Sequence, residues 1–104
     1  MQTFEFSFTG DISPTPFQPV LVGVVGSGNL EVLLETAVSN ECAFRITTSA
    51  IGFEDTWRAV LEDFHLRHRL AGVNISINDM GATPAVVSLR LDQGAAALAQ
   101  AANP

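Results

Sequence analysis

The chain has few charged residues and lacks two residue types altogether. Charged side chains make up 15% of its 104 residues, tyrosine is absent, and no lysine occurs, so arginine supplies all five basic side chains. With 11 acidic residues, the formal net charge is −6. Because a nucleic-acid-binding domain usually carries a basic face or stripe, this composition argues against a nucleic-acid partner.

Cysteine and long apolar runs are also scarce. Cys42 is the single cysteine, so no internal disulfide can form, which fits a protein of a reducing compartment. No apolar run reaches the ~20 residues that a membrane span needs. The first residues show no basic segment followed by an apolar core, as a secretory signal would. We therefore expect a cytoplasmic protein without a membrane partner, folded as a single domain over residues 1–104.

Apolar residues, in contrast, are abundant enough to form a hydrophobic core. They make up 47% of the chain and include seven Phe and one Trp. In residues 3–8, Phe4, Phe6 and Phe8 alternate with polar side chains, which is the period of a half-buried strand. Alternating or β-branched runs predict four further strands, over residues 20–25, 30–34, 43–48 and 73–77.

Helical periodicity begins only at Phe53. Four apolar residues then fall on one face of a helix, namely Trp57, Val60, Leu61 and Phe64. Acidic residues occupy the expected first turn and basic residues the last, which is the favourable arrangement for the helix dipole. Gly72 is the predicted end of this helix.

The last predicted element, residues 84–101, allows two interpretations. Thr83 is a good N-cap, Pro84 is favoured at the first helical position, and apolar residues recur at intervals of four, so we predict a helix. The alternative is a strand over residues 85–91, because apolar and polar side chains also alternate there. Asn103 and Pro104 are expected to fray.

The predicted element order is β-β-β-β-α-β-α. Strands cluster early and helices come late, which favours an α+β fold over an alternating α/β fold. We therefore expect a mostly antiparallel sheet of about five strands with two helices on one face. The apolar stripes of Trp57 and Val87 should then be buried together.

A few residues are candidates for catalysis or metal binding, but each has a simpler interpretation. His65 and His68 are three apart, yet no second cluster of ligands completes a metal site, and the end of a helix favours both histidines. Cys42 has no evident general base, so we expect a buried structural thiol. Asp79 is predicted to form the turn at Gly81.

The stretch Gly26-Ser27-Gly28 is the most informative in the chain. Two glycines leave the Ser27 hydroxyl with little steric cover. By itself the tripeptide favours a hairpin turn. It is not a nucleophile elbow, because Val25 replaces the first glycine and a strand, not a helix, follows; nor is it a P-loop. The chain thus offers an exposed hydroxyl without its own base, as a carrier protein modified by another enzyme would.

In this context the sequence resembles the acyl carrier (delta) subunits of malonate decarboxylase, a bacterial multi-subunit enzyme. The similar stretches are residues 21–34, 46–49, the helix of Trp57, and residues 79–87. The resemblance implies that Ser27 carries 2'-(5''-phosphoribosyl)-3'-dephospho-CoA, attached through a phosphodiester. Members of that family often have Asp where this chain has Asn29.

The resemblance also implies a non-catalytic role and a set of partners. Acetyl and malonyl thioesters would be carried on the attached group between acyl-transferase and carboxy-lyase subunits, after loading by a prosthetic-group transferase. The carrier subunit of citrate lyase, which uses the same group, matches residues 81–84 less well. Two other hypotheses are a protein-interaction domain with an ordinary turn, and a small serine hydrolase acting through Ser27.

Overall fold

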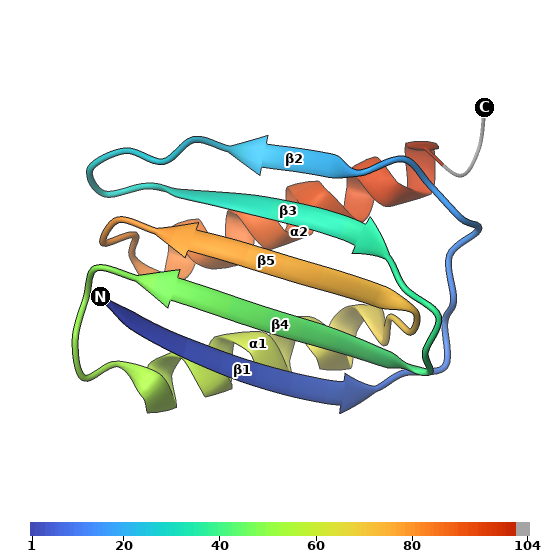
Figure 1. The fold of residues 1–104 in the computed structure, drawn as a ribbon, viewed down its shortest axis with the longest axis horizontal. Helices are drawn as coiled ribbons and strands as arrows, with labels where there is room; N and C mark the ends of the chain where they lie inside the picture. Colours follow the sequence, from blue (N-terminus) through green and yellow to red (C-terminus); the bar gives the residue numbers. More distant parts are fainter. Residues whose placement is uncertain (102–104) are drawn as a thin grey trace.

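The computed structural model describes residues 1–101 and shows a five-stranded sheet with both helices packed against one face (Figure 1). The strands are β1 (Gln2–Thr9), β2 (Val20–Gly23), β3 (Leu30–Thr36), β4 (Glu41–Thr48) and β5 (Val73–Asp79). The helices are α1 (Glu54–His68) and α2 (Pro84–Ala101). The predicted α+β fold and its element order are confirmed. The predicted fraying of Asn103 and Pro104 lies outside the described residues.

The sheet has the strand order β1-β4-β5-β3-β2. Three neighbouring pairs are antiparallel, and the central pair of β4 and β5 is parallel. The sheet is therefore mixed, with antiparallel pairs in the majority as predicted. Parallel neighbours need a crossover connection, and α1 supplies it by running back between the two strands on the covered face.

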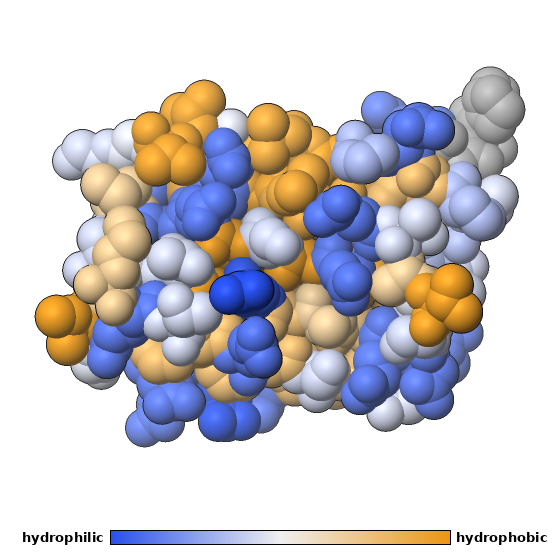
Figure 2. Space-filling model, viewed as in Figure 1, coloured by the Kyte–Doolittle hydropathy of each residue, from blue (hydrophilic) through white to orange (hydrophobic). Residues whose placement is uncertain are grey.

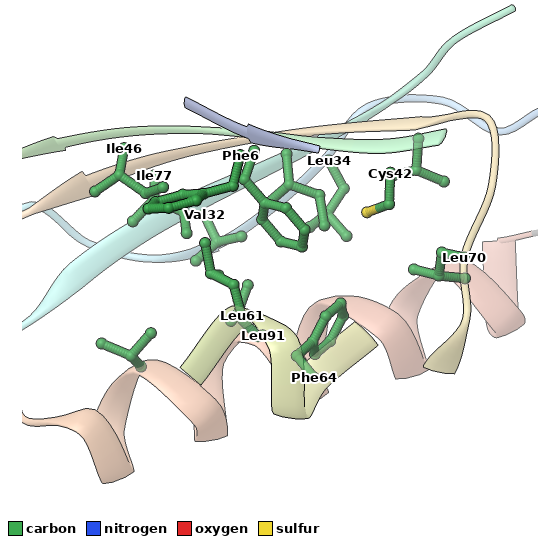
Figure 3. Close-up of a cluster of buried hydrophobic side chains, with 14 of the residues drawn as sticks. Phe6, Val32, Leu34, Cys42, Ile46, Leu61, Phe64, Leu70, Ile77 and Leu91 are labelled. Carbon is green, nitrogen blue, oxygen red and sulfur yellow. The ribbon is translucent and has the colours of Figure 1, made fainter. Parts of the chain in front are cut away.

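The core lies between the sheet and the two helices. Alternate residues of β3, β4 and β5 point into it, and Figure 3 shows Leu61, Phe64 and Leu91 of the helices beneath side chains of the sheet. The predicted joint burial of Trp57 and Val87 is confirmed, because both belong to this core. A glycine in the middle of α2 has a packing reason. A Cβ at Gly94 would lie 2.7 Å from the Leu34 Cδ1 atom, so Gly94 lets α2 lie close to β3.

The second strand is shorter than predicted. β2 ends at Gly23, whereas residues 20–25 were the expected strand. Gly23 has φ +80, and a Cβ there would lie 2.2 Å from the Leu30 carbonyl oxygen, so glycine bends the chain out of the strand. As a result, Val24 and Val25 leave the sheet and are exposed.

The end of α1 also differs from the prediction. The helix ends at His68, and Arg69 is in the left-handed conformation with φ 48. The Arg69 N–H donates to the His65 carbonyl oxygen at 2.7 Å, which closes the last turn. Gly72, the predicted end, instead has φ +72 in the turn that leads into β5.

The beginning of α2 agrees with the predicted helix and excludes the alternative strand over residues 85–91. The Thr83 hydroxyl accepts a hydrogen bond from the Val86 N–H at 3.3 Å, as an N-cap does, and Pro84 is the first helical residue. Within residues 1–101, neither helix has the length and the apolar composition that would let it cross a membrane.

Loops gather at the two ends of the sheet, left and right in Figure 1. We call one end the serine end; it holds the loops of residues 24–29, 49–53 and 80–83. The other, which we call the opposite end, holds residues 10–19, 37–40 and 69–72. The connection of β2 to β3 therefore brings Ser27 beside the loop that follows β5, because β3 and β5 are antiparallel neighbours.

Candidate functional site

Ser27 lies at the corner of a tight turn. The Asn29 N–H donates to the Gly26 carbonyl oxygen at 2.9 Å, which closes a four-residue turn. Gly28 is the third residue of this turn and has φ +72, the positive value that a type II turn needs at that position. Ser27 is thus the second residue of the turn, and it is exposed. The hairpin turn that the tripeptide predicted is confirmed.

This turn is fixed to the end of the sheet. The Gly28 N–H donates to the Met80 carbonyl oxygen at 2.8 Å, and the Met80 N–H donates to the Asn29 carbonyl oxygen at 3.0 Å. The side chain of Asn29 adds a further constraint, because its Oδ1 atom accepts from the Leu30 N–H at 2.8 Å. Ser27 is therefore presented from a position that β5 and β3 hold in place.

The space around Ser27 is open. Apart from the adjoining residues of the chain, a Cβ built on Gly26 or on Gly28 would meet no atom within 4 Å. Gly28 is needed for its positive φ, but Gly26 is not among the glycines with positive φ. Within the described residues, therefore, neither backbone conformation nor packing requires glycine at position 26. The remaining physical effect of glycine there is that it leaves the neighbouring Ser27 hydroxyl accessible.

A buried carboxylate joins the other two loops of the serine end. Asp79 is 3% exposed, and its side-chain oxygens accept hydrogen bonds from the Thr48 hydroxyl at 2.8 Å and from the N–H groups of Gly81 at 3.2 Å and Ala82 at 2.9 Å. Its carbonyl oxygen accepts from the Ser49 N–H at 3.1 Å. The predicted role of Asp79 in the turn at Gly81 is confirmed, and every one of these contacts is internal to the fold.

Exposed apolar side chains surround this end of the molecule. Val24 and Val25 precede Ser27 and are 63% and 52% exposed, and Ile51 and Phe53 in the loop that follows β4 are 71% and 52% exposed. Figure 2 shows apolar surface at the edge of the open sheet face, over β2 and the loop that follows it. A cleft of about 380 Å³ opens between the first turns of the two helices and is lined mainly by apolar residues, among them Phe53, Trp57, Pro84 and Val87.

The two histidines lie at the opposite end and contact other parts of the fold. The ring of His65 stacks on Phe8, and its Nε2 atom is 2.9 Å from the Thr9 carbonyl oxygen. His68 Nε2 is 3.0 Å from the Asp92 Oδ1 atom of α2. In residues 1–101, no group of three His, Cys, Asp or Glu side chains is arranged to hold a metal ion.

The prediction for Cys42 is confirmed. Its side chain is completely buried in the core. Burial raises the pKa of the Cys42 thiol to about 12, because desolvation disfavours the thiolate. The thiol is therefore a small apolar side chain of the core, not a nucleophile.

Arg90 is a residue of the site that sequence reasoning did not find. Its Nε–H donates to the Asn29 Oδ1 atom at 3.4 Å, and its Nη1 donates to the Gln93 Oε1 atom at 3.0 Å. No local pattern could have indicated this contact, because Arg90 and Asn29 are 61 positions apart and lie on α2 and on the β2–β3 loop. The packing of α2 beneath the sheet places a guanidinium beside the turn of Ser27.

The arrangement around Ser27 presents a hydroxyl but does not activate it. Throughout residues 1–101, no His or carboxylate side chain is hydrogen-bonded to Ser27, and the contacts of both histidines are at the opposite end. A serine hydrolase needs a base beside its nucleophile. The fold and the site together define a small α+β domain that presents an exposed serine hydroxyl on a loop held by the sheet, as a carrier domain would.

Comparisons with known proteins agree with this class. The family model described as malonate decarboxylase delta subunit (MdcD) matches residues 17–98. An acyl carrier protein of malonate decarboxylase from Burkholderia cepacia is 65% identical over 99 residues, which are 95% of this chain and 92% of the relative. Another, from Stenotrophomonas maltophilia, is 51% identical over 106 residues and is matched over 100% of both chains. The chain therefore belongs to the malonate decarboxylase delta subunit family.

A solved structure shows the same fold. A chain in the crystal structure of a Pseudomonas malonate decarboxylase hetero-tetramer in complex with malonate has 38% sequence identity to this chain and superimposes with a TM-score of 0.86. The match covers 94% of this chain and 99% of that chain. The suspected family, stated above from sequence stretches alone, is confirmed.

Proposed function

We propose that this acyl carrier subunit of the malonate decarboxylase family holds its prosthetic group on Ser27. The group is 2'-(5''-phosphoribosyl)-3'-dephospho-CoA, joined to the Ser27 oxygen through a phosphodiester, and residues 1–104 act as a single carrier domain. When bound, the group supplies a thiol on which acetyl and malonyl groups travel as thioesters. The observation that carries the proposal is the exposed Ser27 hydroxyl, at the corner of a turn with open space on both sides.

The residues around Ser27 fit a bulky anionic group. Neither neighbouring glycine has a side chain that would obstruct a group on Ser27, and the Arg90 guanidinium lies beside the same loop. The exposed apolar residues of the serine end provide surface for an enzyme that must reach the hydroxyl. Asp79 and the bonds of Met80 hold the loops in place while a partner binds.

We further propose that the chain has no catalytic activity of its own. The absence of a base at Ser27 in the described residues supports this, because the enzyme that loads the group must then deprotonate the hydroxyl. The proposed partners are the acyl-transferase and carboxy-lyase subunits and a prosthetic-group transferase, all in the cytoplasm. The hetero-tetramer that contains the similar solved chain supports partnership with other subunits.

The test is loading of wild type and of Ser27→Ala. Each protein is incubated with the prosthetic-group transferase and the activated precursor, and intact mass and peptide mass spectrometry locate the adduct. We expect wild type to gain one group on Ser27 and Ser27→Ala to gain none. Because an exposed side chain is removed, the free energy of unfolding should change by no more than about 0.5 kcal/mol.

A second serine in a turn serves as the control. Ser39 is exposed, and its hydroxyl accepts a hydrogen bond from the Glu41 N–H at 2.8 Å at the opposite end. Ser39→Ala should load as wild type does. An adduct on Ser27→Ala, or a wild-type adduct on any other residue, would refute the assignment of the site.

A further inference from the structure

Arg90 differs from the arginines of the opposite end in the charge of its partners. Arg67 contacts the carboxylates of Asp63 and Asp92, and Arg69 contacts that of Asp11. Arg90 instead donates to Asn29 and Gln93, which are neutral amides. Within residues 1–101, no carboxylate forms a salt bridge with Arg90, so its positive charge is not neutralised by an acidic side chain of the described fold.

The side chain of Arg90 lies close to both ends of the loop that contains Ser27. Near the start of the loop, a Cβ built on Gly23 would lie 3.4 Å from Arg90 Cδ, so the aliphatic stem passes close to Gly23. At the end of the loop, the Arg90 Nε–H reaches the Asn29 side chain at 3.4 Å. Ser27 belongs to the short segment between these two contacts.

The guanidinium has donors left over for a ligand. Arginine carries five N–H donors in a fixed plane. The hydrogen bonds within the described residues use Nε and Nη1 and leave both N–H groups of Nη2 without a protein partner. A phosphate carries a negative charge and can accept two parallel hydrogen bonds from a guanidinium, whereas the amides now bound are neutral and each accept a single bond from Arg90, so a phosphate would be a better partner.

We propose that Arg90 is a phosphate-binding residue that holds a phosphate of the group attached to Ser27. The inference rests on the proposed function, because it takes the ligand to be a phosphodiester or diphosphate on that serine. Arg90 would then orient the first part of the attached group along the β2–β3 loop and offset its negative charge in a chain whose net charge is already −6. Arg90 does not act in the attachment chemistry; it positions the product.

The test compares unloaded and loaded protein by NMR, after intact mass has shown that loading on Ser27 is complete. On loading, the Arg90 Nε–Hε cross peak should shift. The corresponding peak of Arg45, which is exposed in β4 and forms no salt bridge within residues 1–101, should stay in place. Raising the salt concentration should move the Arg90 peak back toward its unloaded position, because the contact is screened.

Three variants test the same contact by observing the phosphate instead of the arginine. The ³¹P signal of the phosphodiester in loaded wild type should shift with salt. That shift should be lost in Arg90→Gln, partly kept in Arg90→Lys and fully kept in Arg45→Gln. Glutamine and lysine are both good helix formers, so α2 should persist, and far-UV circular dichroism checks this.

The outcomes separate the two proposals. A fully loaded wild-type protein whose Arg90 peak does not move would overturn the phosphate-binding role and leave Ser27 as the attachment site. A salt response of the ³¹P signal that is equal in Arg90→Gln and wild type would do the same. Failure to form any adduct on Ser27 would overturn the proposed function, and the inference with it.

Discussion

The serine end and the opposite end are both closed by hydrogen-bonded loops, but their exposed side chains differ. At the opposite end, charged residues find partners within the chain: Arg67 lies 2.7 Å from Asp92, and Arg69 lies 3.5 Å from Asp11. At the serine end, Val25 and Phe53 are exposed and the cation Arg90 has only neutral partners. The arginines of the opposite end thus have acidic partners in the isolated chain, although Val38 and Leu66 are exposed there too. At the serine end, Arg90 can gain an anionic partner only when something else binds, which suits the attachment site that we propose there.

The largest expected effect is on the free energy of unfolding, and it should differ between the carboxylates of Asp79 and Asp92. Replacing Asp79 with Ala removes the acceptor of three buried or half-buried donors, so the free energy of unfolding should fall by about 3 kcal/mol. Replacing Asp92, whose side chain is 42% exposed, should cost only about 0.5 kcal/mol. Urea unfolding measures both. Equal losses would contradict the view that Asp79 is what holds the serine end together.

The next effect concerns binding and leaves stability unchanged. Val25→Ser removes an exposed apolar side chain two positions before Ser27. If this surface is covered by the acyl-transferase subunit, affinity should fall on the order of tenfold. Val38→Ser, at the fully exposed turn of the opposite end, is the matched control and should bind as wild type. Isothermal titration calorimetry measures the affinity of each variant for the acyl-transferase subunit. A similar loss of affinity in both variants would contradict the distinction between the two ends.

A smaller effect separates the two glycines beside Ser27. Gly28→Ala forces a Cβ into a positive φ and should lower the free energy of unfolding by about 1 kcal/mol. Gly26→Ala should leave stability unchanged, yet slow loading, because the added methyl group narrows access to the hydroxyl. Thermal unfolding measures the stability of both variants, and the initial rate of mass gain measures how fast each is loaded. Normal loading of Gly26→Ala would show that access is not limited there.

The smallest expected effect is a pH dependence of the contact between the two helices at Asp92. Partial burial raises the pKa of Asp92, but hydrogen bonds from Arg67 and His68 outweigh it and hold that pKa below its usual value. The contacts of the ionised Asp92 therefore stabilise the fold above the unfolded-state pKa of about 3.9. This contribution to the free energy of unfolding is lost as the pH falls through the lowered pKa of Asp92. Unfolding followed between pH 6 and pH 2 in wild type and Asp92→Asn should show curves that converge in acid. Curves that stay parallel would argue that the contact with Asp92 carries no stability.

Local patterns predicted most of the fold. Alternating and β-branched runs located all five strands, and the Thr83-Pro84 pair helped to locate the second helix. Local patterns could not give the strand order, because the parallel pairing of β4 with β5 depends on how α1 packs across the sheet. They also misplaced two boundaries, at Gly23 and Arg69, where backbone conformation rather than side-chain periodicity ended the element.

For the site, the sequence indicated the residue but not its surroundings. Ser27 was predicted from its flanking glycines and from the resemblance to a known family. Its rigid attachment to Met80 depends on the register between β3 and β5, which no local pattern encodes. The position of Arg90 could not be predicted, because a lone arginine on a helix has no sequence feature that indicates where its guanidinium will lie.

The type II turn has a consequence for the geometry of delivery. Hydrogen bonds from Asn29, Gly28 and Met80 fix the turn to the sheet, so the loop loses its conformational entropy when the protein folds and not when a partner binds. If the group is attached as we propose, Ser27 acts as a fixed pivot, and all the freedom of a carried thioester comes from the attached group. Its effective concentration at a docked active site is set by the length of that group. Loosening the pivot would enlarge the volume that the thioester explores and dilute it at every site that it must reach.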